Sequence, residues 1–133
     1  MKFWKEWETN MAIVRDAVSY AGNGGNGSSF SVAHTCTGSN LILVTFVGAN
    51  TASDIVSGVT YNGVAMTRAS GQFVGANSVS AYLYYLINPA TGTHNITVSH
   101  TNNIGVQMDS ASYTGVKQTG QPDATSTAST AAA

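Results

Sequence analysis

Hydrophobic and polar side chains alternate most regularly between Val79 and His100, and this alternation predicts two β-strands joined by a tight turn at residues 88–92. In the second strand Ile96 and Val98 lie opposite polar residues, which indicates one buried face. The first strand is apolar or aromatic on nearly both faces, so we expect its outer side to be covered as well. Its two faces are Val79, Ala81, Leu83, Tyr85 and Ile87 on one side, and Ser80, Tyr82, Tyr84 and Leu86 on the other.

The same alternation predicts further strands before and after this stretch. They are expected at about 12–20, 30–34, 41–47, 59–66 and 104–113, where the range 59–66 holds two short strands. Asn62-Gly63 between these two is a strong hairpin signal, because a type I′ turn needs positive φ at both positions. Loops are expected at 21–29, 48–57 and 71–78. The pattern predicts about eight strands, no helix after residue 11, and an all-β fold: an antiparallel two-sheet β-sandwich of the Ig-like or jelly-roll kind.

Both ends of the chain differ in composition from the middle, which predicts an N-terminal arm at 1–11, the sandwich at 12–115 and a C-terminal tail or linker at 116–133. The arm contains Phe3 and both tryptophans, Trp4 and Trp7. Because Trp is enriched at interface hot spots, the arm is either a frayed terminus or an anchor on a neighbouring subunit. The tail is rich in Thr, Ser and Ala, a composition that cannot form a core of its own, so we expect a linker or an arm that orders against a partner.

Charged residues make up only 8% of the chain, and the formal net charge is −1. The five Lys and Arg residues never cluster, so there is no electrostatic attraction to nucleic acid or to an anionic membrane. Cys36 is the single cysteine, which excludes an internal disulfide. No apolar run approaches the ~20 residues that span a bilayer, and the N-terminus lacks the apolar stretch of a signal peptide. We therefore expect a protein that leaves its cell by lysis or without a classical signal.

The residue pattern predicts no catalytic residues, no cofactor and no metal. Asp54 and Asp109 are the acids between residues 17 and 116, and solvation of a loop and a strand explains them better than the paired carboxylates of a glycosidase. Cys36 is interpreted as a small buried thiol rather than as a nucleophile paired with a histidine. His94 and His100 would share a strand face about 20 Å apart, too far for one metal ion.

Five segments in this order resemble a β-sandwich domain that recurs in structural proteins of tailed bacteriophages and in some bacterial surface proteins. They are Ser31–Val44, Val59–Thr67, Leu83–Gly92, Ile96–Val98 and Ala111–Thr119. The resemblance implies an Ig-like or jelly-roll module displayed on a virion, where it decorates the head or is built into a tail or fibre. It implies no catalytic residues. The aromatic arm at 1–11 lies outside the resemblance, as an added docking arm would.

Together these observations lead to the hypothesis of a non-enzymatic virion structural protein, such as a capsid decoration protein, that forms homo-oligomers. Strand edges, an outward aromatic face and the terminal arms would bury surface against identical subunits or against a major capsid or tail protein. Low charge keeps the desolvation of such contacts inexpensive. The expected contact residues are Phe3, Trp4, Trp7, Tyr82, Tyr84 and Leu86.

Two alternatives stay open. The first is a carbohydrate-binding or adhesin module in which Tyr82 and Tyr84 contact host glycans, although Tyr more often packs on a sheet face and keeps its hydroxyl in water. The second is an extracellular subunit of a bacterial surface filament, whose Thr/Ala-rich tail pairs into the next subunit.

Overall fold

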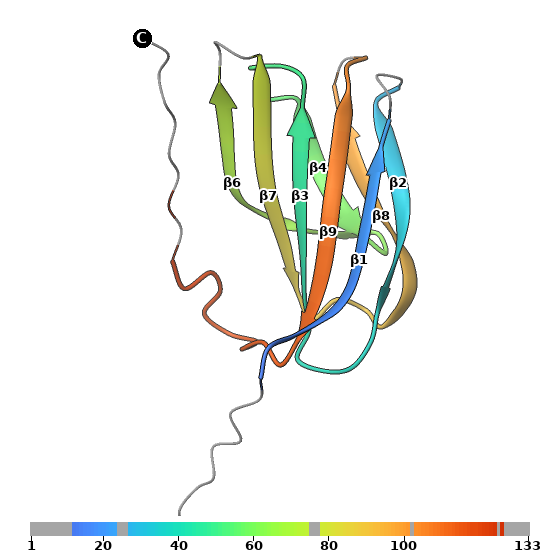
Figure 1. Ribbon diagram of the computed structural model, residues 1–133, viewed down its shortest axis with the longest axis vertical. Helices are drawn as coiled ribbons and strands as arrows, with labels where there is room; N and C mark the ends of the chain where they lie inside the picture. The colour runs from blue at the N-terminus through green and yellow to red at the C-terminus, as the bar shows by residue number, and fades with distance from the viewer. Residues whose placement is uncertain (1–11, 24–26, 75–77, 102, 125, 127–133) are drawn as a thin grey trace, which may run out of the picture.

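Nine β-strands and no helix make up the described part of the chain in the computed structural model, which describes residues 12–23, 27–74, 78–101, 103–124 and 126. Five strands form one antiparallel sheet in the order β1-β9-β3-β7-β6, and four form a second in the order β2-β8-β4-β5 (Figure 1). The predicted all-β, two-sheet antiparallel sandwich is therefore confirmed. The strands are β1 (Val14–Gly22), β2 (Ser29–Cys36), β3 (Ile42–Ala49), β4 (Val56–Tyr61), β5 (Val64–Ala65), β6 (Thr67–Val74), β7 (Val79–Ile87), β8 (Gly92–His100) and β9 (Val106–Thr114).

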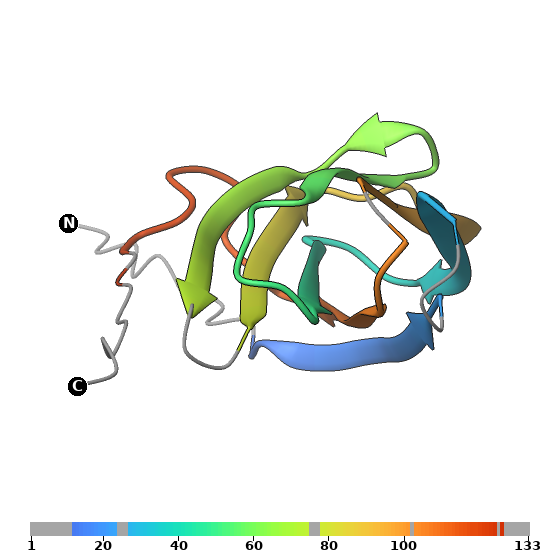
Figure 2. The ribbon, with the colours of Figure 1, turned by 90° about the horizontal axis from the view of Figure 1, so that it is seen from above.

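The two sheets enclose one interior, which the view from above shows between them (Figure 2). Side chains from both sheets fill this interior. Leu43 and Val47 from β3 meet Val59 and Tyr61 from β4, and none of the four is more than 1% exposed. In β3 buried positions alternate with more exposed ones, as the period of two in a strand requires. Burial of this apolar surface stabilises the fold by roughly 25 cal/mol per Å².

The link between β7 and β8 is not a hairpin turn, and this part of the sequence prediction is wrong. β7 pairs with β3 and β6, whereas β8 pairs with β2 and β4 in the other sheet. Residues 88–91 therefore cross between sheets that lie about 10 Å apart, a distance that four residues can span. Asn88 begins the crossing in the left-handed region at φ 51°. The Tyr61 hydroxyl hydrogen bonds to the carbonyl oxygens of Ala90 and Gly92, which ties the link to β4.

The predicted Asn62-Gly63 hairpin is confirmed. Asn62 has φ 49° and Gly63 has φ 75°, and β4 pairs with β5 directly on either side of this turn. The strand β6, which begins soon after the hairpin, has no counterpart among the predicted strands, and its second half lies in the expected loop at 71–78. Its sequence, TRASGQFV, has little alternation of its own. It forms an edge strand because its backbone hydrogen-bonds to that of β7.

The first residues after β9 stay attached to the sandwich. The Val116 N–H donates to the carbonyl of Asn40 at 2.9 Å, and the Gln118 side-chain amide donates to the carbonyl of Leu41 at 3.2 Å. The chain then turns back along the outer side of the five-stranded sheet, on the β6 side of the molecule in both ribbon views (Figures 1 and 2). Part of the compositionally distinct tail thus packs on the domain itself.

Candidate interaction surface

The outer face of the five-stranded sheet carries apolar side chains that the strand register aligns in rows. In one row Val18, Ala111, Val44 and Tyr85 stand opposite one another on β1, β9, β3 and β7. The neighbouring rows contribute further apolar residues, and we call the whole set the outer-face patch. It consists of Val18, Tyr20, Ile42, Val44, Phe46, Leu83, Tyr85, Asp109, Ala111 and Tyr113.

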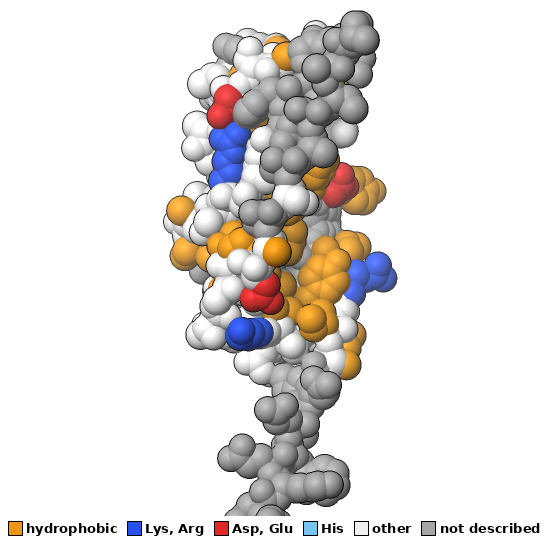
Figure 3. Space-filling model, turned by 90° about the vertical axis from the view of Figure 1, so that its left-hand side faces the viewer, with side chains coloured by type: hydrophobic (Ala, Val, Ile, Leu, Met, Phe, Trp, Pro, Cys, Tyr) orange, Lys and Arg blue, Asp and Glu red, His pale blue; other side chains and the backbone are white. Residues whose placement is uncertain are grey.

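The outer-face patch is unusually open for such a composition. Tyr20 is 79% exposed, Val18 is 63% exposed, and Phe46 in the middle strand is 44% exposed. Asp109 is the one charged member of the set, and the exposed Arg15 of β1 stands opposite Tyr113 at its edge. The view from the β6 side shows hydrophobic side chains gathered on the right, toward this outer face, with isolated charged groups beside them (Figure 3). A contiguous exposed apolar surface of this kind is typical of an interaction site.

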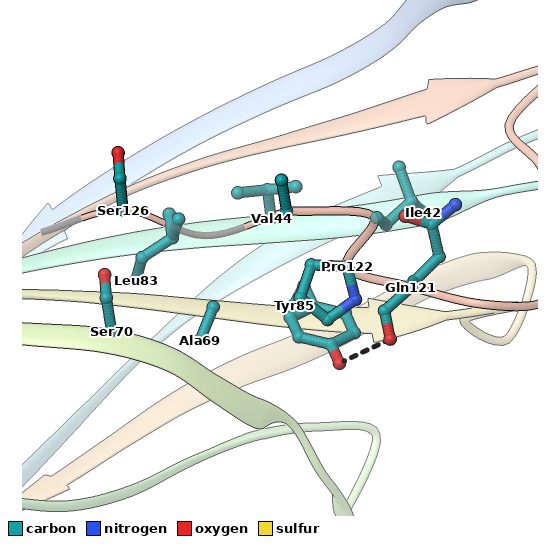
Figure 4. A pocket seen from close by; sticks show the side chains of 10 residues that line it. Ile42, Val44, Ala69, Ser70, Leu83, Tyr85, Gln121, Pro122 and Ser126 are labelled. Carbon is teal, nitrogen blue, oxygen red and sulfur yellow. Dashed lines mark hydrogen bonds between the residues drawn. The ribbon is translucent and has the colours of Figure 1, made fainter.

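One hollow in the patch, of about 340 Å³, lies beneath the C-terminal segment. We call it the C-terminal groove. In Figure 4 the side chains of Val44 and Leu83 rise toward this segment, and the Tyr85 hydroxyl donates a hydrogen bond to the carbonyl of Gln121 at 3.3 Å. Its walls come from three strands and the tail: Ile42, Val44, Ala69, Ser70, Leu83 and Tyr85, covered by Gln121, Pro122, Ala124 and Ser126.

A second hollow lies on the part of the patch toward β1, away from the tail. Val18 and Tyr20 of β1, Phe46 of β3 and Tyr113 of β9 contribute to it, with Asp109 at its side. No described residue of the C-terminal segment lines this hollow. The uncovered part of the patch therefore presents aromatic and aliphatic side chains directly to the surroundings.

The predicted contact residues on β7 lie on the wrong face for such a surface. Tyr82 is 1% exposed and Tyr84 is 4% exposed, so both rings are in the interior, and Leu86 packs half-buried against the core. The Tyr82 hydroxyl accepts a hydrogen bond from the Ile55 N–H and donates to the carbonyl of Ser53, which satisfies its polar end inside the fold. Because these rings are buried, Tyr82 and Tyr84 do not present the exposed platform that the glycan alternative expects of them. Alternation identified the two faces of β7, but since both are apolar it could not tell which one is inside.

The other predicted contact residues, Phe3, Trp4 and Trp7, lie outside the described residues. The outer-face patch could have been recognised in part from the sequence, since Leu83 and Tyr85 stand on the same predicted face of the strand at 79–87. Its other members come from three strands that are distant in sequence.

A buried polar cluster joins the two sheets at the β1–β2 side of the sandwich. The Ser112 hydroxyl donates to Asp16 Oδ2 at 2.7 Å, so its oxygen is left to accept a hydrogen bond from His34 Nε2 at 3.0 Å. This assigns the proton of the neutral imidazole to Nε2, and the other ring nitrogen, Nδ1, accepts from the Ser19 hydroxyl at 2.8 Å. Asp16 also accepts from the backbone N–H and the hydroxyl of Thr37.

The charge states in this cluster follow from burial and hydrogen bonding. Burial lowers the pKa of His34, and the nearby negative charge of Asp16 only partly opposes this effect. For Asp16, burial by itself would raise the pKa, but hydrogen bonds from Thr37 and Ser112 outweigh it and lower the pKa below its usual value. Burial also raises the pKa of Cys36, which has no exposed surface, so it is a protonated thiol at neutral pH.

The bonding order in the cluster differs from that of a nucleophilic triad. There the histidine accepts the serine proton and the carboxylate orients the histidine. Here the Ser112 proton points to Asp16, and His34 donates to the serine oxygen instead. Ser112 has no exposed surface and His34 is 2% exposed, so a substrate could reach neither without separation of the sheets. The arrangement joins β1, β2 and β9 mechanically.

Other described acids and histidines lie apart from this cluster or at its edge. Asp54 pairs with Arg68 at 2.9 Å, and Asp109 lies in the outer-face patch. His94 and His34 stand opposite each other on β8 and β2. Among the described residues, no group of three or more His, Cys, Asp and Glu side chains is placed to hold a metal ion.

Comparison of the chain with protein-family models, with curated proteins and with solved structures found no match. The described residues include no helix that could cross a membrane.

Proposed function

We propose that this chain is a non-enzymatic structural protein of the virion-surface type, which assembles through the outer face of its five-stranded sheet. The observation that supports the proposal most directly is the exposed outer-face patch, which is apolar apart from Asp109 and has Arg15 at its edge. The resemblance of its segments to structural proteins of tailed bacteriophages supports the virion setting. The partner we propose is a second copy of the same chain.

The size of the face fits such a partner. Five strands of about eight residues present a surface of roughly 24 by 26 Å, about 600 Å². A standard protein interface covers about 800 Å² on each partner, so this sheet face, together with the C-terminal segment that lies on its β6–β7 side, supplies most of one. The chemistry fits as well, because an apolar patch can pack on its own copy around a two-fold axis without bringing many like charges together. Sparse charge across the chain, at 8% of residues, lowers the desolvation cost further.

Sedimentation velocity over a range of concentrations tests the assembly proposal. The full chain is expected to self-associate, and Phe46→Asp is expected to weaken that association by at least about tenfold, because it places a charge at the centre of the patch. Val64→Asp is the matched control: Val64 is 52% exposed but lies on β5 in the other sheet. Association that Phe46→Asp leaves intact, or that Val64→Asp weakens equally, contradicts the proposed surface.

The virion setting has a separate test in the gene's surroundings. Capsid, portal or tail genes next to this one are expected. A neighbourhood of genes for surface-filament assembly would instead favour the filament alternative.

A further inference from the structure

The outer-face patch contains a groove that already holds a peptide. We infer that the C-terminal groove is a docking site for the segment that contributes Gln121, Pro122, Ala124 and Ser126, and that in the assembled protein the segment of a neighbouring copy takes this site. The inference rests on the proposed function, because it assumes that copies meet through the outer face of the five-stranded sheet.

The segment lies on the groove and stays largely exposed to solvent. Gln121, Pro122, Ala124 and Ser126 line the groove and Asp123 does not, and of these five residues only Gln121 is partly buried. The described contacts are apolar apart from the hydrogen bond between Tyr85 and the carbonyl of Gln121. Nothing in this set of contacts requires that the segment belong to the same molecule as the groove.

The connection to the rest of the chain permits a change of partner. Gln118 is held by its hydrogen bond to the carbonyl of Leu41, and only two residues separate it from Gln121. These two residues, Thr119 and Gly120, are both exposed, and Gly120 has φ +74°, a conformation from which glycine can move at little cost. The link can therefore redirect the segment while the sandwich stays intact.

Concentration decides between the two arrangements, because the same contacts form within one copy and between copies. In a free copy the tether keeps the segment at roughly millimolar effective concentration, so it occupies its own groove. Two copies docked through the outer face bring each segment near the other groove at a comparable concentration. Exchange is then expected in the assembled state and not in dilute monomers.

Peptide binding tests the groove. A fluorescent peptide of residues 116–126 is titrated onto a chain that ends at Gly120, which keeps all nine strands because β9 ends at Thr114. Saturable binding is expected, with about tenfold weaker binding to the full chain, whose own segment competes. Leu83→Asp is expected to abolish binding and Val64→Asp to preserve it. No saturable binding, or binding that Leu83→Asp leaves unchanged, overturns the assignment of the groove.

Cysteine pairing tests the exchange. One full chain carries Ala124→Cys and a tagged second full chain carries Ala69→Cys, so that a disulfide across the groove can form only between copies. Mixing them under mild oxidation is expected to give covalent heterodimers, and far fewer when Val64→Cys replaces Ala69→Cys. Cross-linking that occurs only when both cysteines are on one chain overturns the exchange. Sedimentation of the unmodified chain reports the proposed assembly independently: association without heterodimers means that only the exchange is wrong.

Discussion

Replacement of Ser112 by alanine is expected to destabilise the fold strongly, because this one hydroxyl serves two partners. It donates to Asp16 at 2.7 Å and accepts from His34 at 3.0 Å. The variant loses a hydrogen bond to a charged group, about 1.5–3 kcal/mol, and leaves the buried His34 N–H without its acceptor, about 1–3 kcal/mol. Asp16 is partly exposed and keeps Thr37 as a donor, so the first loss falls at the low end. We expect a total of about 2.5–4.5 kcal/mol, a large share of the 5–15 kcal/mol typical of a domain.

Urea denaturation followed by circular dichroism measures this loss. With a slope of about 2 kcal/mol per molar urea, the midpoint is expected to fall by roughly 1–2 M without a change in slope. Ser31→Ala is the matched control, because Ser31 makes a comparable hydroxyl contact with Thr97, at 2.7 Å, on the exposed surface. Its effect should stay within about 0.5 kcal/mol. If Ser112→Ala is no more destabilising than Ser31→Ala, the cluster does not join the sheets as described.

Two further predictions concern the interior. Because the pKa of His34 is lowered in the folded protein, the unfolded chain binds more protons than the folded one as the pH falls below about 6.5, and the free energy of unfolding should decline in that range. The loss due to the lowered pKa of Asp16 begins only below about pH 4. A urea midpoint that does not fall between pH 7.5 and 5.5 contradicts the prediction for His34. Tyr82→Phe removes the acceptor of the Ile55 N–H and should lower the free energy of unfolding by about 1–3 kcal/mol while leaving self-association unchanged. Weakened association with unaltered stability would mean that Tyr82 is an interface residue after all.

Several properties follow from the amino-acid sequence alone because they depend on residues that are neighbours in the chain. Alternation with a period of two predicts most of the strands, and Asn62-Gly63 predicts its hairpin because few other residue pairs adopt two positive φ angles in succession. A strand without clear alternation, such as β6, escapes this kind of reasoning. It forms because its backbone pairs with β7, and its own eight residues do not specify that partner.

Tertiary structure alone decided which face of β7 is buried, which sheet each of β7 and β8 joins, and which distant residues meet. Alternation divides a strand into two faces, but when both faces are apolar only the packing of the opposite sheet selects the inner one. The same limit applies to the polar cluster, where Asp16 and Ser112 are 96 positions apart and meet through strand pairing across the whole domain. Local sequence sets the geometry of each strand. The competition of all strands for partners and for the shared interior sets their arrangement, and with it the outer-face patch on which the proposed function rests.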